Sequence, residues 1–259
     1  MHYQEHNWPT IAAIDKNTPV IISLGSLEQH GHHLPVFTDT LQVEAIARAA
    51  EQKMPQECLL LPTLWLGSSD HHLDFPGTIS VSGELYSQMI RSVARSLLKA
   101  GFTRQLFLNG HGGNFAPISQ ALTDFCNEDD QADATYLILA NWWGLCRDAI
   151  TPAALGTKQA AINHACEYET SLMLHLHPRL VNMPDAIDRL PVLDSQWTKT
   201  GKATWFSRFA RRTAGGATGL PTLATVEKGK KIFDAAVADL ITFLREFRMW
   251  PASSKLGPK

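Results

Sequence analysis

The chain has 259 residues, of which 44% are hydrophobic and 19% are charged, and its formal net charge is −2. This composition is typical of a globular protein with a sizeable core, and the charge gives no reason to expect nucleic-acid binding. No apolar run approaches the roughly 20 residues of a membrane span, and the N-terminal residues lack the layout of a signal peptide. The four widely spaced cysteines form no C-x-x-C pair, so we expect reduced thiols in a cytoplasmic protein.

Strand-like and helix-like segments alternate along the chain. In chain order they are a strand at 19–24, a helix at 39–53, a strand at 58–67, a helix at 82–101, a strand at 104–110, a helix at about 114–127, a strand at 134–143, and helices at 164–178 and 227–247. The first strand, "PVIISL", is almost wholly apolar, which is typical of a parallel strand buried on both faces. The alternation predicts an α/β fold with a mostly parallel sheet covered by helices, in one domain spanning residues 1–259.

The segment 185–218 differs from the rest because it is basic, aromatic and glycine-rich without a clean period. We expect a long loop or short helix over one end of the sheet, acting as a lid or a subunit interface. Its basic residues could contact an anionic substrate, although a solvated lid or a subunit contact is the favoured interpretation; they are Lys199, Lys202, Arg208, Arg211 and Arg212.

Potential metal ligands follow the first strand in "SLGSLEQHGHHLPVFTDT". Glu28 and His30 are two residues apart, so an extended backbone points both side chains the same way. Asp39 begins the following helix, where it or Thr38 could equally be a plain helix cap. Carboxylate and imidazole ligands suit Zn²⁺, Mn²⁺ or Fe²⁺, and the absence of cysteine argues against a structural zinc site.

A glycine-rich turn, "NGHGGN", follows the strand at 104–110 and carries His111. It is neither a dinucleotide-binding fingerprint nor a P-loop, since it lacks the P-loop lysine. The glycines let the backbone approach closely and leave His111 as the reactive side chain. The alternative is an ordinary tight turn that happens to contain a histidine.

Glu169 lies within the apolar stripe of the helix predicted at 164–178. A carboxylate on a buried helix face is costly unless it is paired or binds a cation, so Glu169 is a candidate ligand. A buried salt bridge to Arg147 or Arg179 is the alternative. Glu167 points away from this stripe, which predicts a supporting or solvated role.

Weaker candidates lie near the same strand ends. His164 precedes the helix at 164–178 and could be a general acid or an ordinary residue of the capping region. Trp142 and Trp143 could form the wall of a substrate pocket, although core packing is at least as frequent for aromatic residues at a strand end. His71 and His72 carry less weight, beside an "FPGT" turn that would shape the pocket.

Four blocks of the sequence together resemble the creatininase (creatinine amidohydrolase) family. They are "GSLEQHGHHLPVFTDT", "NGHGGN", "HACEYETSLML" and "GATGLPTLATVEKGK", in the family's order, from about residue 20 to 232. The resemblance implies a three-layer α/β/α sandwich, a two-metal hydrolase site, and a homo-oligomer, often a hexamer. The family's metal ligands and active-site histidine match a set of residues that includes an aspartate bridging both ions: Glu28, His30, Asp39, His111, Glu169 and His164.

The chain departs from creatininases at Gly113, where they carry a metal-binding glutamate. This departure argues against creatinine as the substrate and suggests that Glu169 completes the second metal site. Relatives with the "NGHGGN" form include deformylases of nucleotide-like intermediates and a peptidase that trims a modified peptide.

The expected activity is hydrolysis of a non-peptide C–N bond, in a cyclic amide or formamide of a small molecule. Two divalent ions (Zn, Mn or Fe) would activate the water, with Glu167 or His164 moving the proton. Three alternatives stay open: a peptidase of the same fold, a non-catalytic relative that binds a metal or metabolite, and a nucleotide-binding protein using the turn at 110–113.

Overall fold

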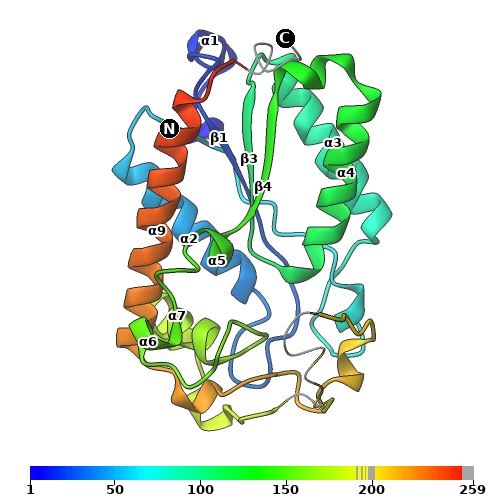
Figure 1. The fold of residues 1–259 in the computed structure, drawn as a ribbon, viewed down its shortest axis with the longest axis vertical. Coiled ribbons are helices and arrows are strands. Elements are labelled where there is room, and N and C mark those ends of the chain that lie inside the picture. The colour runs from blue at the N-terminus through cyan, green and yellow to red at the C-terminus, as the bar shows by residue number, and fades with distance from the viewer. Residues whose placement is uncertain (191, 194, 196, 198–201, 253–259) are drawn as a thin grey trace.

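A parallel four-stranded sheet runs through the centre of the molecule (Figure 1). In the computed structural model, all residues except 191, 194, 196, 198–201 and 253–259 are described. The strands are β1 (Val20–Leu24), β2 (Leu59–Leu60), β3 (Arg104–Asn109) and β4 (Tyr136–Asn141), in the order β2-β1-β3-β4. All three strand pairs are parallel, so the carboxyl ends of the strands meet at one edge.

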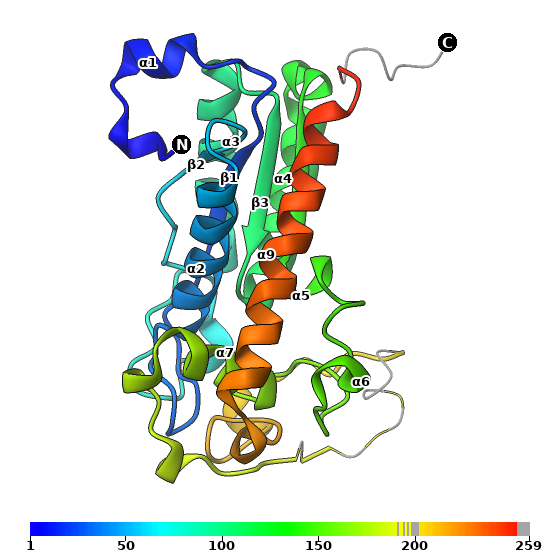
Figure 2. The same cartoon turned by 90° about the vertical axis from the view of Figure 1, so that its left-hand side faces the viewer.

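Helices cover both faces of this sheet, which confirms the predicted α/β/α fold class. The longer ones are α2 (Thr38–Lys53), α3 (Gly83–Lys99), α4 (Phe115–Glu128), α7 (Glu167–Leu176) and α9 (Val226–Met249), and the short ones are α1 (Trp8–Ala13), α5 (Trp142–Leu145) and α6 (Pro152–Leu155). Figure 2 shows α9 running alongside α2, opposite α3 and α4. Among the described residues, no helix is long and apolar enough to cross a lipid bilayer.

The core is divided by the sheet into two apolar layers, because successive side chains of a strand point to opposite faces. Ile21 of β1 packs with the apolar residues of α2 and α9, while Val20 and Ile22 pack with those of α3 and α4. All five residues of β1 are buried, as expected for a central parallel strand.

The second strand is shorter than the predicted strand at 58–67, because its register against β1 slips around Pro62. Leu59 and Leu61 donate to the carbonyls of Pro19 and Ile21, but the next donor to β1 is Leu64, which donates to Ser23. Three residues here span two residues of β1, so the regular ladder ends at Leu60. The predicted strand at 134–143 also ends early, because Trp142 begins α5.

Helix α7 starts at Glu167 and not at His164. Ala165 adopts a left-handed conformation with φ of 48°, which a helix cannot contain. His164 therefore lies on the segment that enters α7, with its direction set by this turn.

Helices α7 and α9 pack unusually closely at Gly229. A Cβ added to Gly229 would lie 1.9 Å from the carbonyl oxygen of Ser171. The "EKGK" block thus contains a glycine that lets two helix backbones meet. Since α7 carries Glu169, this contact also fixes the position of a candidate ligand.

Candidate metal centre

The start of α2 lies against the ends of β1 and β3, and this contact positions Asp39. A Cβ on Gly25, just after β1, would lie 2.2 Å from the Thr40 hydroxyl oxygen, and one on Gly110 would lie 2.8 Å from Cβ of Val43. The Thr40 hydroxyl also donates to the Ser26 carbonyl at 2.8 Å. The two glycines therefore let α2 approach until Asp39 lies between the loops that follow the two central strands.

Asp39 faces a different imidazole with each carboxylate oxygen. Its Oδ1 lies 3.1 Å from Nε2 of His30, and its Oδ2 lies 3.0 Å from Nδ1 of His111. The same Nδ1 of His111 lies 3.2 Å from Oε1 of Glu28. All four side chains are at least 95% buried.

The second nitrogen of each imidazole is held by the backbone, which orients the ring. Nδ1 of His30 lies 3.1 Å from the Glu28 carbonyl, and Nε2 of His111 lies 3.2 Å from the Ser68 carbonyl. In the neutral rings these two nitrogens donate, so the remaining nitrogens point lone pairs at carboxylate oxygens. Acceptor then faces acceptor, and only a proton or a cation between them makes the arrangement favourable.

Glu169 joins His30 and Asp39 from α7. One potential ligand atom from each of the three lies within 4.8 Å of the others. Neither Arg147 nor Arg179 pairs with Glu169 in the described part of the chain. The cluster therefore divides into two groups that share Asp39: Glu28, Asp39 and His111, and His30, Asp39 and Glu169.

Buried polar atoms without a hydrogen-bond partner test whether these residues suit a cation. Among the described residues they include both carboxylate oxygens of Glu28, Nε2 of His30 and Oδ2 of Asp39. Such atoms are costly to bury unpartnered, and a carboxylate and imidazole donor set is the one that Zn²⁺, Mn²⁺ and Fe²⁺ accept. The residues present fit a pair of divalent ions.

The pKa values of the side chains in the cluster indicate which of them hold a proton when no metal is bound. Burial disfavours charge on His30 and His111, but the adjacent carboxylates outweigh burial and raise both pKa values to about 10. The pKa of Asp39 is lowered, because the two imidazoles outweigh burial. Burial, together with the charges of Asp39 and Glu28, raises the pKa of Glu169 to about 8.

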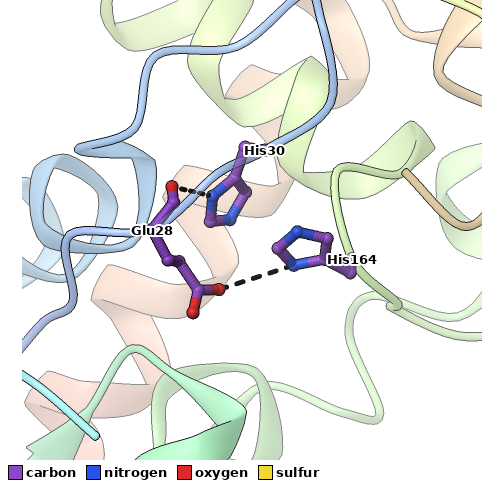
Figure 3. A group of neighbouring side chains, drawn as sticks. All are labelled: Glu28, His30 and His164. Atoms are coloured by element: carbon purple, nitrogen blue, oxygen red, sulfur yellow. Dashed lines mark hydrogen bonds and ion pairs between the residues drawn. The ribbon is translucent and has the colours of Figure 1, made fainter. Parts of the chain in front are cut away.

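His164 lies beside Glu28 and His30, as Figure 3 shows. Its Nε2 lies 2.8 Å from the Gln29 carbonyl, and its Nδ1 lies 3.6 Å from Oε1 of Glu28. Burial and the nearby His30 hold the pKa of His164 well below the ordinary value, so the ring is neutral at pH 7. With Nε2–H donated to the backbone, Nδ1 presents a lone pair to the cluster.

Glu167 lies elsewhere, at the contact between α7 and α9. It is fully buried and pairs with Lys228 Nζ at 2.7 Å, and it accepts the backbone N–H groups of Lys158 and Gln159 at 3.2 Å. Every strong partner of Glu167 is therefore structural, and it does not line the cavity described next.

A cavity of about 580 Å³ opens over the cluster. Trp143 and Arg212 are among its lining residues, whereas Trp142 is buried in the core between the sheet and α9. His71 and His72 also line the cavity, and Nε2 of His72 lies 3.5 Å from Oε2 of Glu28. These two histidines received little weight from the sequence, because a short turn has no periodicity to mark them.

Part of the segment 185–218 forms one wall of this cavity. Phe209 stacks on His72 with ring centroids 4.2 Å apart and meets His164 edge-on at 4.6 Å. Of the basic residues singled out there, Arg212 lines the cavity and Arg208 pairs with Asp74 at 3.0 Å. Lys199 lies outside the described residues. The sequence did not single out Phe209, because the segment 185–218 has no periodicity that distinguishes residues lining the cavity from residues facing solvent.

The fold and the cluster define a protein of the α/β/α class with a site suited to metal. The family described as "Creatininase: Creatinine amidohydrolase" matches residues 4–244. The chain belongs to the creatininase family.

Individual relatives differ in what they act on. The mycofactocin precursor peptide peptidase of Mycobacterium tuberculosis (strain CDC 1551 / Oshkosh) is 33% identical over 235 residues, covering 86% of this chain and 82% of that protein. The 3-dehydro-scyllo-inosose hydrolase of Thermotoga maritima is 30% identical over 256 residues, covering 92% and 80%. A mutant creatininase solved with creatine superimposes with a TM-score of 0.80 at 25% identity, covering 96% of this chain and 99% of its own. Solved creatininases of this fold include a zinc–zinc form and a manganese form.

Proposed function

We propose that this protein is a dinuclear metal-dependent amidohydrolase that cleaves a non-peptide C–N bond, in a cyclic amide or a formamide of a small molecule. The observation that carries the proposal is the set of buried, unpartnered ligand atoms of Glu28, His30 and Asp39 beneath a cavity of about 580 Å³. A cavity of this volume suits a small-molecule substrate.

Two groups of residues would hold the ions, with Asp39 shared between them. Glu28, Asp39 and His111 would hold one ion, and His30, Asp39 and Glu169 the other. When bound, the ions would lower the pKa of a water molecule and polarise the amide carbonyl. Zinc and manganese are supported by the metal forms of the related creatininases, and iron suits the same ligands.

His164 would move the proton. Its Nδ1 faces the cluster with a free lone pair, so it can accept a proton from the attacking water and deliver it to the departing nitrogen. The Gln29 carbonyl would fix the tautomer throughout, and Phe209 against the ring would keep bulk water away. Glu167, the alternative for this step, has its charge engaged by Lys228.

A peptidase acting on a small or modified peptide is the second candidate. The relative at 33% identity that is named as a peptidase favours it, and so does Gly113, since it argues against creatinine. A screen comparing modified peptides with cyclic amides and formamides would separate the two candidates. A metal-binding protein without activity is less favoured, because a cavity of substrate size opens over the ligand groups and His164 faces them.

Two further proposals concern the oligomeric state and the cellular location of the protein. A homo-oligomer, such as a hexamer, is supported by the exposed apolar side chains of Phe206, Trp197 and Leu190. Light scattering on the purified protein would test the oligomeric state. A cytoplasmic location is supported by the four free cysteines, three of which are buried.

The direct test is the metal content of untagged protein purified without chelator. We expect about two equivalents of zinc, manganese or iron per chain, and loss of metal and turnover in Glu28→Ala and His111→Ala. His32→Ala, in the same loop but exposed, is the matched control and should keep both. A wild-type protein that takes up no metal, or full activity in either ligand variant, would refute the proposal.

A further inference from the structure

Position 113 is sterically closed to any side chain, and His71 contributes to closing it. A Cβ on Gly113 would lie 2.6 Å from Cε1 of His71, 2.4 Å from Nε2 of His111 and 2.5 Å from the Ser68 carbonyl oxygen. The glutamate expected at this position from the family resemblance has no room here. The space beside His111 is occupied by the imidazole of His71.

His71 also meets the geometric requirement for a ligand. One potential ligand atom from each of His71, Glu28 and His111 lies within 4.8 Å of the others. Its ring lies nearly parallel to that of His111, at 18° with centroids 5.7 Å apart. His71 lines the cavity, so a cation held by Glu28 and His111 would be within its reach.

The turn that carries His71 is held from both sides. It spans Asp70–His72, and Asp70 accepts the Ser80 hydroxyl at 2.6 Å while the Ser69 backbone N–H donates to the same hydroxyl oxygen at 2.7 Å. On the far side, Nδ1 of His72 contacts the Gln29 side-chain amide at 2.8 Å. A ligand on such a turn keeps its position without depending on the metal.

We propose that His71 is a metal ligand of this protein, completing the ion site formed by Glu28, Asp39 and His111. The inference rests on the proposed dinuclear site and adds a residue to it. With His71 this site has two carboxylates and two imidazoles, a donor set that suits Zn²⁺, Mn²⁺ and Fe²⁺. Gly113 and His71 then act together, because the absence of a side chain at one position makes room for the other.

The test compares His71→Ala, His71→Glu and the control His32→Ala with the wild type by metal content and by cobalt(II) titration of the metal-free proteins. In His71→Ala we expect one of the two ions to bind at least about tenfold more weakly, since losing even a residue that only orients a ligand typically weakens binding by that factor. The visible spectrum of that variant's cobalt(II) form should also change, since the ion loses a nitrogen ligand. His71→Glu should restore binding of the second ion, because a carboxylate is also a ligand.

The outcomes separate this inference from the proposed function. Two ions bound by His71→Ala at wild-type affinity, with an unchanged cobalt(II) spectrum, would overturn the role of His71 and leave the dinuclear hydrolase intact. A wild-type protein that binds no ion would overturn both. If His71→Ala does not fold by circular dichroism, His71→Glu decides: a cobalt(II) spectrum altered from the wild type supports ligation, and an identical spectrum refutes it.

Discussion

Two neighbouring residues of the "HACEYETS" block, His164 and Glu167, have opposite surroundings. His164 has one nitrogen fixed by a backbone carbonyl and the other facing the cluster, while Glu167 has its charge paired with Lys228. The first arrangement suits proton transfer and the second suits holding two helices together.

We therefore expect the substitutions His164→Gln and Glu167→Gln to have different effects. A glutamine at 164 cannot accept a proton, so kcat should fall about 100-fold or more, while metal content and unfolding midpoint stay near the wild type. Glu167→Gln leaves Lys228 without its counter-charge and should lower the free energy of unfolding by up to about 3 kcal/mol, with activity kept in the folded fraction. Steady-state kinetics and urea denaturation on both variants measure this, and equal loss of activity in the two would contradict it.

The role of a single residue could be predicted from the sequence only where a local pattern distinguished that residue from its neighbours. Glu28 and His30 follow a buried strand at alternate positions, and Glu169 interrupts an apolar stripe, so each stood out locally. Glu167 could not be assigned in this way, because its partner Lys228 lies 61 residues away and meets it only once α7 and α9 pack. His71 could not be assigned either, because it lies in a short turn without periodicity and comes near Glu28 and His111 only in the folded chain.

At the scale of elements, the contact between α7 and α9 controls where Glu169 lies. We expect Gly229→Ala to force these helices apart, because its Cβ would overlap the Ser171 carbonyl at 1.9 Å. The free energy of unfolding should fall by about 1–3 kcal/mol, with weaker metal binding as Glu169 moves. Thermal denaturation and metal titration provide the measurements.

Gly112→Ala is a matched control for this change. A Cβ at Gly112 would meet nothing within 4 Å, although the residue lies next to His111. It should leave both stability and metal binding close to the wild type. A Gly229→Ala protein as stable as Gly112→Ala would show that the helices adjust at no cost.

The elements themselves were largely predictable from apolar patterns, and their ends were less so. The strand at 58–67 looked continuous because its leucines are apolar, but its pairing with β1 slips by one residue around Pro62, which an apolar pattern does not reveal. The helix at 164–178 was predicted to begin three residues too early, because nothing in the sequence marks the left-handed turn at Ala165. Such a turn is set by what packs around it.

At the scale of the whole molecule, the metal-free protein should lose stability as pH rises from 7 to 9. The folded pKa values of His30 and His111 are raised to about 10 and that of Glu169 to about 8, against ordinary values of 6.5 and 4.5. In this window the folded state holds protons that the unfolded chain has already released, so the free energy of unfolding falls as pH rises. Urea midpoints of chelator-treated protein at pH 7, 8 and 9 test the direction.

Metal-loaded protein is the control for this dependence. Cations take the place of the protons, so the fall should disappear when the site is filled. A midpoint that rises with pH in the metal-free protein would contradict the proton arrangement described for the cluster.

The shared position of Asp39 has a consequence for the abundance of the protein. Its neighbours in the cluster come from the loop after β1, the turn after β3 and helix α7, so a bound ion ties together segments from across the sequence. Ligand binding to the folded state alone adds about 2.7 kcal/mol at a hundredfold excess over Kd. A cell short of the metal would then degrade this protein faster, and would hold fewer copies as well as less active ones.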